Sequence, residues 1–230
     1  YTSQITLINK NIIMSTNKLK PEQIKAFKEK EVGVFKADED GFIDLRNIEW
    51  FADEVFATGD KEWGLAILKK IEVLAENFYD LEGIMERLKK LNENDRLLAL
   101  IKKAEPMIET EDYGVSGCYL LAGNFVVSID KDYARELYKK SEDHAVDFNE
   151  FNELSGSLAN DSDDKENALK IVQLRCIPLI DEKDHHNRLS QSAQVVRTLI
   201  DLGEIQEDNE GTNFNHSIQI LADYRKKNNL

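Results

Sequence analysis

The 230 residues are 41% hydrophobic and 32% charged, a balance typical of a globular protein and not of a disordered chain. The formal net charge of −14 argues against a general nucleic-acid binder, because phosphate neutralisation needs clustered Lys and Arg, and it would repel an anionic membrane surface. No apolar run reaches the roughly 18 residues of a membrane-spanning helix, so we expect a cytoplasmic protein with no membrane partner.

Residues 1–17 are expected to be a disordered or extension segment, within which Met14 looks like a natural start and residues 1–13 an upstream extension or a flexible tail. Polar residues at 9–11 interrupt its apolar stretch, so it lacks the apolar core of a secretion signal. An N-terminal helix and an acidic turn should occupy residues 18–43. The chain has only three prolines and 11 glycines, which favours long helices over a strand-and-turn fold.

Residues 44–202 carry a four-fold internal repeat of a helix-long motif. Each of the first three copies begins with an acid, carries Lys-Lys near its end and closes with Glu. The fourth copy keeps the acid but loses both lysines. The copies begin at Glu62, Asp95, Asp132 and Glu166, which are 33, 37 and 34 residues apart. A period of this length is typical of stacked helical hairpins.

Aspartates mark where the expected helices begin, because an Asp side chain can accept hydrogen bonds from the free amides of a first helical turn. The candidate caps are Asp44, Asp60, Asp80, Asp112, Asp130, Asp147 and Asp164. Together with apolar spacing of helical period, they predict a helix at 44–57 and pairs at 61–77/80–92, 95–109/112–129, 131–145/147–160 and 165–180/184–202. Residues 203–230 should form a polar linker and a C-terminal cap helix.

The Lys-Lys pairs of the first three copies are expected on the solvated face of their helices. Successive residues point about 100° apart on a helix, so the two lysines of a pair cannot form one tight site by themselves. Charged residues also stay exposed as a rule. The pattern therefore predicts a regularly spaced row of solvated lysines.

The period, the paired helices and the aromatic residue early in the first helix, Trp63 in one copy and Tyr133 in another, resemble tetratricopeptide-like repeats and their Sel1-like relatives over residues 44–202. Ile67 and Leu137 stand where that family has a small glycine, and no proline closes the units. The resemblance implies an all-α solenoid of α-α hairpins wound as a right-handed superhelix. It also implies a concave groove that holds a peptide or a protein.

We therefore expect a non-enzymatic scaffold or adaptor that binds a protein partner, with Trp63, Tyr133 and Tyr138 of the first helices as candidate groove residues. The negative charge suits a basic partner. No Gly-rich phosphate loop, Gly-x-Ser-x-Gly or Cys-x-x-Cys occurs, so no catalytic residue and no cofactor is expected. An acidic immunity- or antitoxin-type inhibitor of a basic toxin is the alternative, and the same charge motivates it.

Residues 36–47 resemble an EF-hand calcium loop, with Asp38 and Asp40 at the third and fifth positions and Asp44 at the ninth. The loop begins with a lysine where an acid belongs, and it ends with an asparagine where a bidentate Glu belongs. An acidic turn capped by Asp44 is the favoured interpretation. The three aspartates remain weak metal candidates, and a calcium-responsive protein is a second alternative.

Overall fold

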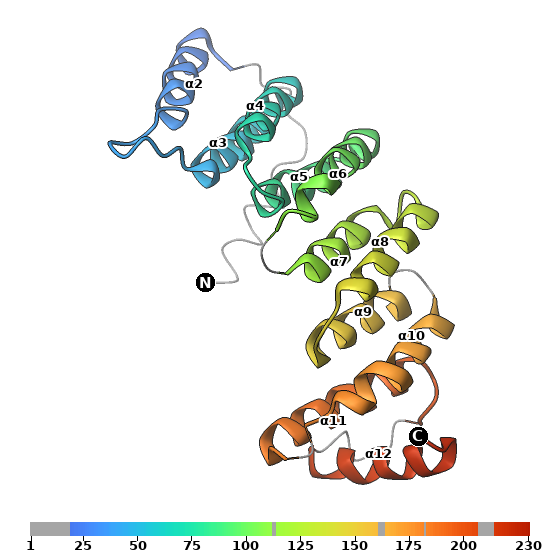
Figure 1. Ribbon diagram of the computed structural model, residues 1–230. Helices are drawn as coiled ribbons and strands as arrows, with labels where there is room; N and C mark the ends of the chain where they lie inside the picture. The colour runs from blue at the N-terminus through green and yellow to red at the C-terminus, as the bar shows by residue number, and fades with distance from the viewer. Residues whose placement is uncertain (1–18, 112–113, 161–163, 182, 207–213) are drawn as a thin grey trace. The chain divides into compact units, whose positions relative to one another are not determined.

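The computed structural model describes residues 19–111, 114–160, 164–181, 183–206 and 214–230 (Figure 1). Every regular element in these ranges is helical, which confirms the all-α class, and the ranges contain 11 α-helices. The chain divides into two compact units, unit 1 (Tyr1–Leu91) and unit 2 (Asn92–Leu230). This boundary falls inside the stretch predicted as repeats. The predicted extension at 1–17 and the predicted cap Asp112 lie outside the described residues.

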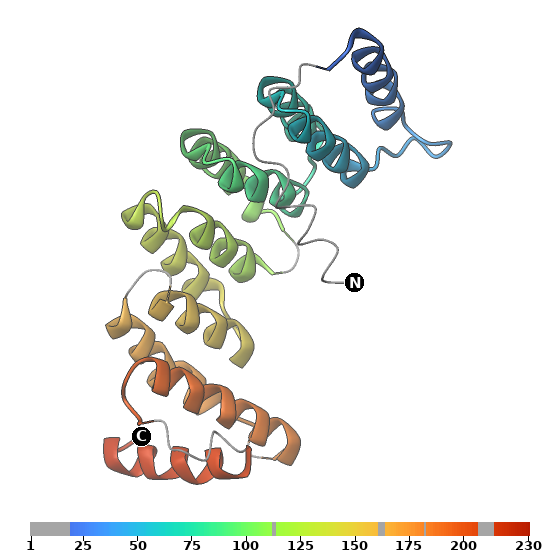
Figure 2. The same ribbon diagram turned by 180° about the vertical axis from the view of Figure 1, so that it is seen from behind.

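Unit 1 contains α2 (Pro21–Val34), α3 (Leu45–Ala57), α4 (Lys61–Leu74), the short 3₁₀ helix η1 (Tyr79–Leu81) and α5 (Glu82–Lys90). One face of α3 is apolar at helical spacing and is buried in the core of the unit. α3 packs along α4 and also contacts α2 (Figure 2). The turn between α3 and α4 contains Gly59 at a φ of +86°, a backbone conformation that glycine adopts without steric cost.

Unit 2 contains α6 (Asn94–Ile108), α7 (Val115–Val126), α8 (Lys131–His144), α9 (Phe148–Asn160), α10 (Lys165–Ile171), the π-helical η2 (Val172–Cys176), the 3₁₀ helix η3 (Ile177–Leu179), α11 (His185–Asp201) and α12 (Phe214–Asn228). Consecutive helices pack against each other from α6 to α10, and α11 contacts both α9 and α12 (Figure 1). Residues 214–228 thus confirm the predicted C-terminal helix. Among the described helices, none has the length and apolar character needed to cross a bilayer.

Helix α7 contacts three other helices of unit 2, α6, α8 and α9. Its buried residues are therefore distributed around the whole helix. Between α7 and α8, the Ser141 hydroxyl donates a hydrogen bond to the Ser116 carbonyl at 2.9 Å. The Tyr138 ring occupies the space in front of Gly123, where an added Cβ would lie 2.6 Å from a ring carbon. The missing side chain of Gly123 allows α8 to approach α7 closely.

Most of the predicted aspartate caps are confirmed. Each of these carboxylates accepts a hydrogen bond from a backbone amide in the first turn of the helix that follows, at 3.0 to 3.4 Å. The residues concerned are Asp44, Asp60, Asp130, Asp147 and Asp164. Because capping satisfies amides that no helical carbonyl can reach, the five helices begin directly after these residues, as predicted.

The prediction that Asp80 caps a helix over 80–92 is wrong. Asp80 lies inside η1, and its carboxylate accepts hydrogen bonds from the preceding amides of Glu76 at 2.8 Å and Asn77 at 3.2 Å. The α-helix begins two residues later, at Glu82. Asp80 therefore orders the chain that enters η1, and the helix after it is correspondingly shorter.

The predicted helix at 165–180 is not a single α-helix. Regular α-helical bonding ends at Ile171, and the chain continues through η2 and η3. Pro178 explains the change, because it has no amide hydrogen and its ring collides with the carbonyl four residues earlier in a regular helix. The wider π turn of η2 accommodates this interruption.

Candidate functional site

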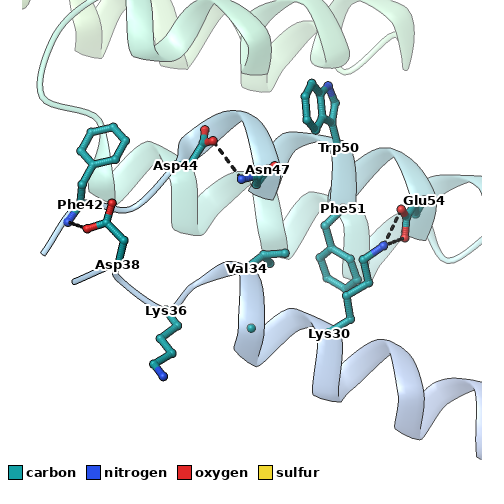
Figure 3. Close-up of a pocket in the computed structure, with 11 residues that line it drawn as sticks. Lys30, Val34, Lys36, Asp38, Phe42, Asp44, Asn47, Trp50, Phe51 and Glu54 are labelled. Carbon is teal, nitrogen blue, oxygen red and sulfur yellow. Dashed lines mark hydrogen bonds and ion pairs between the residues drawn. The ribbon is translucent and has the colours of Figure 1, made fainter. Parts of the chain in front are cut away.

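A cavity of about 510 Å³ lies in unit 1 between α2, α3 and the loop that joins them (Figure 3). Val34 of α2, Phe42 of the loop and Trp50 and Phe51 of α3 provide its apolar lining. Cavities of this size hold small ligands or a few side chains of a bound segment. The cavity is therefore the candidate functional site of the chain.

The loop holds Phe42 at the edge of the cavity by hydrogen bonds to one aspartate. The Asp38 carboxylate accepts from the backbone amides of Asp40 at 3.0 Å and Phe42 at 2.8 Å, and the Asp38 amide donates to the Phe42 carbonyl at 2.9 Å. Gly41 has a φ of +85°, which closes this tight turn at a position that favours glycine. The turn fixes the Phe42 backbone while its side chain stays 66% exposed.

The α3 side of the cavity is an outward-facing row of side chains. Asn47, Trp50 and Glu54 share one face of the helix because they are three and four residues apart. Trp50 is 62% exposed, whereas its neighbour Phe51 is 1% exposed and forms part of the cavity wall. Figure 3 shows the Phe42 and Trp50 rings pointing to the same side, with Asn47 between them.

Five charged side chains line the cavity, but they do not all face it. Lys30 donates to both carboxylate oxygens of Glu54 at 2.6 Å, so these two charges compensate each other. Asp44 caps α3 and also accepts from the Asn47 side chain at 2.9 Å. The Lys36 ammonium points away from the Phe42 and Trp50 rings (Figure 3). Three carboxylates and two lysines thus give the lining a formal charge of −1.

The weak metal candidates Asp38 and Asp44 use their carboxylates on backbone amides. Asp40, the third candidate, is exposed and contributes its amide to the Asp38 turn. In the part of the chain that the structure describes, no group of three or more His, Cys, Asp or Glu side chains is arranged to hold a metal ion. Asp44, at the end of the loop, caps α3.

Trp63, a predicted groove residue, lies within unit 1 at the contact of α4 with α2 and α3. Its ring centroid is 6.1 Å from that of Phe27 and 6.2 Å from that of Phe51, both in edge-to-face geometry. Its indole Nε1 donates to the Glu31 carboxylate of α2 at 3.1 Å. Trp63 is half-buried and links three helices, and it does not line the cavity.

The other two predicted groove residues belong to unit 2. Tyr138 is only 2% exposed, and its hydroxyl donates to the Asn124 side chain at 2.8 Å, so it serves the packing of α7 and α8. Tyr133 is half-buried and donates to the Glu105 carboxylate of α6 at 2.8 Å. The structure places these side chains in helix-helix contacts, whereas Phe42, Trp50 and Tyr79 are exposed aromatic residues, of which the first two line the cavity.

Two glutamates each hold together an aromatic residue and a lysine, and we call these arrangements glutamate clamps. In unit 1, Glu31 accepts from Trp63 and, at 2.5 Å, from the Lys70 ammonium. In unit 2, Glu105 accepts from Tyr133 and from the Lys140 ammonium. The second lysine of the repeated Lys-Lys pair thus has a defined partner in these two copies.

The glutamate clamp of unit 2 shifts the pKa values of its members. Burial alone would raise the pKa of the Glu105 carboxyl, but hydrogen bonds from Lys140 and Tyr133 outweigh burial and lower it below 4.5. The hydrogen bond to Glu105 raises the pKa of Lys140. Burial, followed by the hydrogen bond to Glu105, raises the pKa of Tyr133, so the phenol stays neutral and donates its proton. The clamp is a charge-assisted helix contact.

A second polar cluster lies next to this clamp on α6, α7 and α8. The buried Tyr119 donates to the Glu109 carboxylate, and its ring stacks on His144 with centroids 5.8 Å apart. The His144 Nε2 is 4.0 Å from a Glu109 oxygen. Tyr119, Glu109 and His144 thus all contact one another. We therefore interpret the cluster as part of the unit 2 packing.

The sequence predictions missed Phe42 and Trp50, although a signal for Trp50 exists. The buried stripe of α3 contains Ile48, Phe51 and Val55, spaced three and four residues apart, and Trp50 is out of phase with it. A large aromatic residue on the polar face of a helix is a candidate for ligand contact. Phe42 carries no comparable signal, because a turn residue has no periodic neighbours.

The chain matches no protein-family model, none of the curated proteins and no solved structure.

Proposed function

We propose that the chain is a non-catalytic protein-interaction module that binds a segment of a protein partner in the cavity between α2 and α3. The observation that carries this proposal is the pair of aromatic side chains at the cavity, Phe42 and Trp50, both roughly two-thirds exposed. Aromatic residues supply much of the binding energy of protein interfaces, and Trp does so most often. Exposed aromatic residues next to a cavity are therefore suited to be covered by a partner.

We also propose that the helices form a tetratricopeptide-like solenoid with a right-handed superhelix. The period of 33 to 37 residues supports it, as does the recurrence of a glutamate clamp in each unit. Small-angle X-ray scattering tests the arrangement, since a compact protein of this length has a radius of gyration of about 17 Å. A clearly larger value supports an extended solenoid, whereas a value near the compact one contradicts it.

Site-directed photo-crosslinking tests the interaction role. A photoreactive amino acid in place of Asn47 should capture a partner from the source cells, because this position lies between Phe42 and Trp50. The same group in place of the exposed Lys139 of α8 serves as the positional control. In the Asn47 background, Trp50→Ala should reduce capture at least about tenfold, and Val73→Ala, which removes an exposed apolar side chain of α4, should leave it unchanged. Equal capture with and without Trp50 would contradict the proposal.

An acidic inhibitor of a basic toxin remains the second candidate, because the net charge of −14 favours rapid association with a basic protein. The two functions differ in their salt dependence. Inhibition through long-range charge loses association rate steeply as salt rises, whereas docking of an apolar anchor in the cavity does not. Measuring the association rate of the captured partner at low and high salt distinguishes them.

A further inference from the structure

We infer that the segment bound between α2 and α3 carries arginine next to a bulky aliphatic residue. This inference rests on the proposed function and adds the chemistry of the partner. It follows from two features of the cavity taken together: exposed aromatic side chains, and two carboxylates, those of Asp38 and Asp44, that form no ion pair with the lysines of the lining. An arginine side chain matches both features at once, because it is planar, cationic and attached through an apolar stem.

The aromatic faces favour a guanidinium group. Trp50 presents the best cation-binding ring among the natural side chains, and Arg stacks on such rings more often than Lys does. Phe42 points to the same side as Trp50, so the bound segment can place its apolar or planar groups against either ring (Figure 3). Both rings are mostly exposed, so stacking removes apolar surface from water as well.

The charges select a cation over an anion. Lys30 and Glu54 neutralise each other at 2.6 Å, and Lys36 points away from the two rings. Apart from Lys36, the remaining lining charges are the carboxylates of Asp38 and Asp44, and Asp38 uses a single oxygen, Oδ1, for both of its backbone hydrogen bonds. A guanidinium forms bidentate hydrogen bonds with carboxylates of this kind. An acidic segment would instead meet like charge.

The apolar wall accounts for the aliphatic residue. Phe51 and Val34 line the cavity below the two exposed rings, and Phe51 is almost fully buried. These groups cannot satisfy a charge, so the deeper part of the cavity fits a Leu, Ile or Met side chain. A purely ionic segment would leave the half-buried side chain of Val34 partly in contact with water. The bound segment therefore needs both kinds of residue.

Binding of fluorescent peptides of equal length tests the inference by anisotropy with the full chain. The probes are an alternating Arg-Leu peptide, an Arg-Ser peptide that lacks the apolar residues, and a Glu-Leu peptide that reverses the charge. The Arg-Leu peptide should bind at least about tenfold more tightly than the other two, because a hot-spot contact of this size is lost in each. Tightest binding of the Glu-Leu peptide, or equal binding of Arg-Leu and Arg-Ser, would overturn the inference.

Variants with matched charge separate the cavity from the general acidity of the protein. Asp38→Asn combined with Asp44→Asn removes two charges at the cavity, and Asn still accepts the backbone hydrogen bonds that these residues receive. Asp130→Asn combined with Asp184→Asn removes two charges from helix caps in unit 2 and serves as the control. Only the first pair should weaken the Arg-Leu peptide, by about fivefold or more. An equal effect of both pairs would show nonspecific attraction and would overturn the inference.

Trp50→Ala completes the test, with Val73→Ala as the control for loss of an exposed apolar residue. Arg-Leu binding that survives Trp50→Ala would place the peptide elsewhere and overturn the inference. Self-association that blocks peptide binding and is abolished by Trp50→Ala would show a second copy as the occupant, which also overturns it. The proposed function is tested independently of this inference. Photo-crosslinking from position 47 can still capture a partner when no arginine peptide binds, and in that case only the inference about arginine is overturned.

Discussion

The indole of Trp63 on α4 donates a hydrogen bond at 3.1 Å to the carboxylate of Glu31 on α2, 32 residues earlier in the chain. Tyr133 on α8 has the same relationship to Glu105 on α6, at 2.8 Å. The two aromatic residues occupy the second position of their repeat copies. The same kind of contact between a helix and an earlier helix therefore occurs in both units.

The aromatic residue and the lysine have the same spacing in both glutamate clamps. Lys70 follows Trp63 by seven residues, and Lys140 follows Tyr133 by seven. Seven residues are about two helical turns, so the aromatic residue and the lysine share one face and reach the same carboxylate. The other lysine of each pair is exposed, as predicted from the sequence.

Removing the indole donor should destabilise unit 1 modestly. In Trp63→Phe the ring contacts with Phe27 and Phe51 remain, but Glu31 loses one hydrogen bond at a half-buried site. We expect the free energy of unfolding to fall by about 1 kcal/mol. Urea denaturation measures this change, and Trp50→Phe, on the exposed face of α3, is the control with no expected loss. Equal losses for the two variants would show that the hydrogen bond contributes nothing.

Glu105 should make unit 2 sensitive to acid. The pKa of its carboxyl in the folded protein is lower than 4.5. Its contribution to the free energy of unfolding is therefore complete above pH 4.5, and it is lost as pH falls through the folded pKa. Glu105→Gln should therefore cost about 1 kcal/mol at neutral pH and progressively less below pH 4.5. Urea titrations from neutral to acidic pH, with Glu153→Gln of α9 as the exposed control, test this expectation. A deficit that stays constant with pH would refute it.

The sequence predicts helix starts well where the cause is local. Asp60, Asp130 and Asp164 each cap the helix that begins at the next residue, because the cap and its amide partners are neighbours in the chain. The cap predicted at Asp80 is wrong, because its carboxylate accepts hydrogen bonds from amides that precede it in the chain and not from those that follow it. Pro178 is a further local signal, and it accounts for the early end of α10.

Contacts between helices were not predictable in the same way. Glu31 and Glu105 are 28 to 39 residues away from their partners, and only the packing of the helices decides which carboxylate lies near which donor. The cavity likewise depends on how α2 crosses α3. Tyr138 shows the limit most clearly, because its sequence position is that of a groove residue and its packing against Gly123 makes it a core residue.

Two glycines of α7 should respond to alanine in opposite directions. A Cβ at Gly123 would lie 2.6 Å from the Tyr138 ring, whereas a Cβ at Gly117 would meet nothing within 4 Å. Gly123→Ala should destabilise unit 2 by about 1 to 3 kcal/mol, because the ring must move in a packed core. Gly117→Ala should stabilise it by up to about 1 kcal/mol through helix propensity. Thermal unfolding of both variants tests this prediction. A change of the midpoint temperature in the same direction for both variants would contradict the packing described for Gly123.

The Arg87 guanidinium of α5 joins two carboxylates of α3, and it provides the last test. It bonds Asp53 with two nitrogens, at 2.8 and 2.9 Å, and Glu49 with one, at 2.9 Å. The Arg87 and Glu49 side chains are only 14% and 15% exposed. Burial raises the pKa of Glu49 in spite of the neighbouring guanidinium. Loss of Arg87 would therefore leave a poorly solvated carboxylate without its counter-ion.

Arg87→Met should lower the free energy of unfolding at neutral pH by about 2 to 3 kcal/mol, somewhat less than for a fully buried pair. A carboxyl with a raised pKa in the folded protein stabilises the fold below that pKa, and this stabilisation is lost as pH rises through it. The loss of unfolding free energy in Arg87→Met should therefore be smaller in acid. Arg87→Met combined with Glu49→Met should recover much of the loss, since no buried charge then remains. Lys90→Met, which breaks an exposed pair with Glu86, should change stability by less than about 0.5 kcal/mol. Urea denaturation of the set at neutral and acidic pH measures all of these effects. A double variant no more stable than Arg87→Met would show that the loss comes from packing of the arginine stem and not from the unpaired charge.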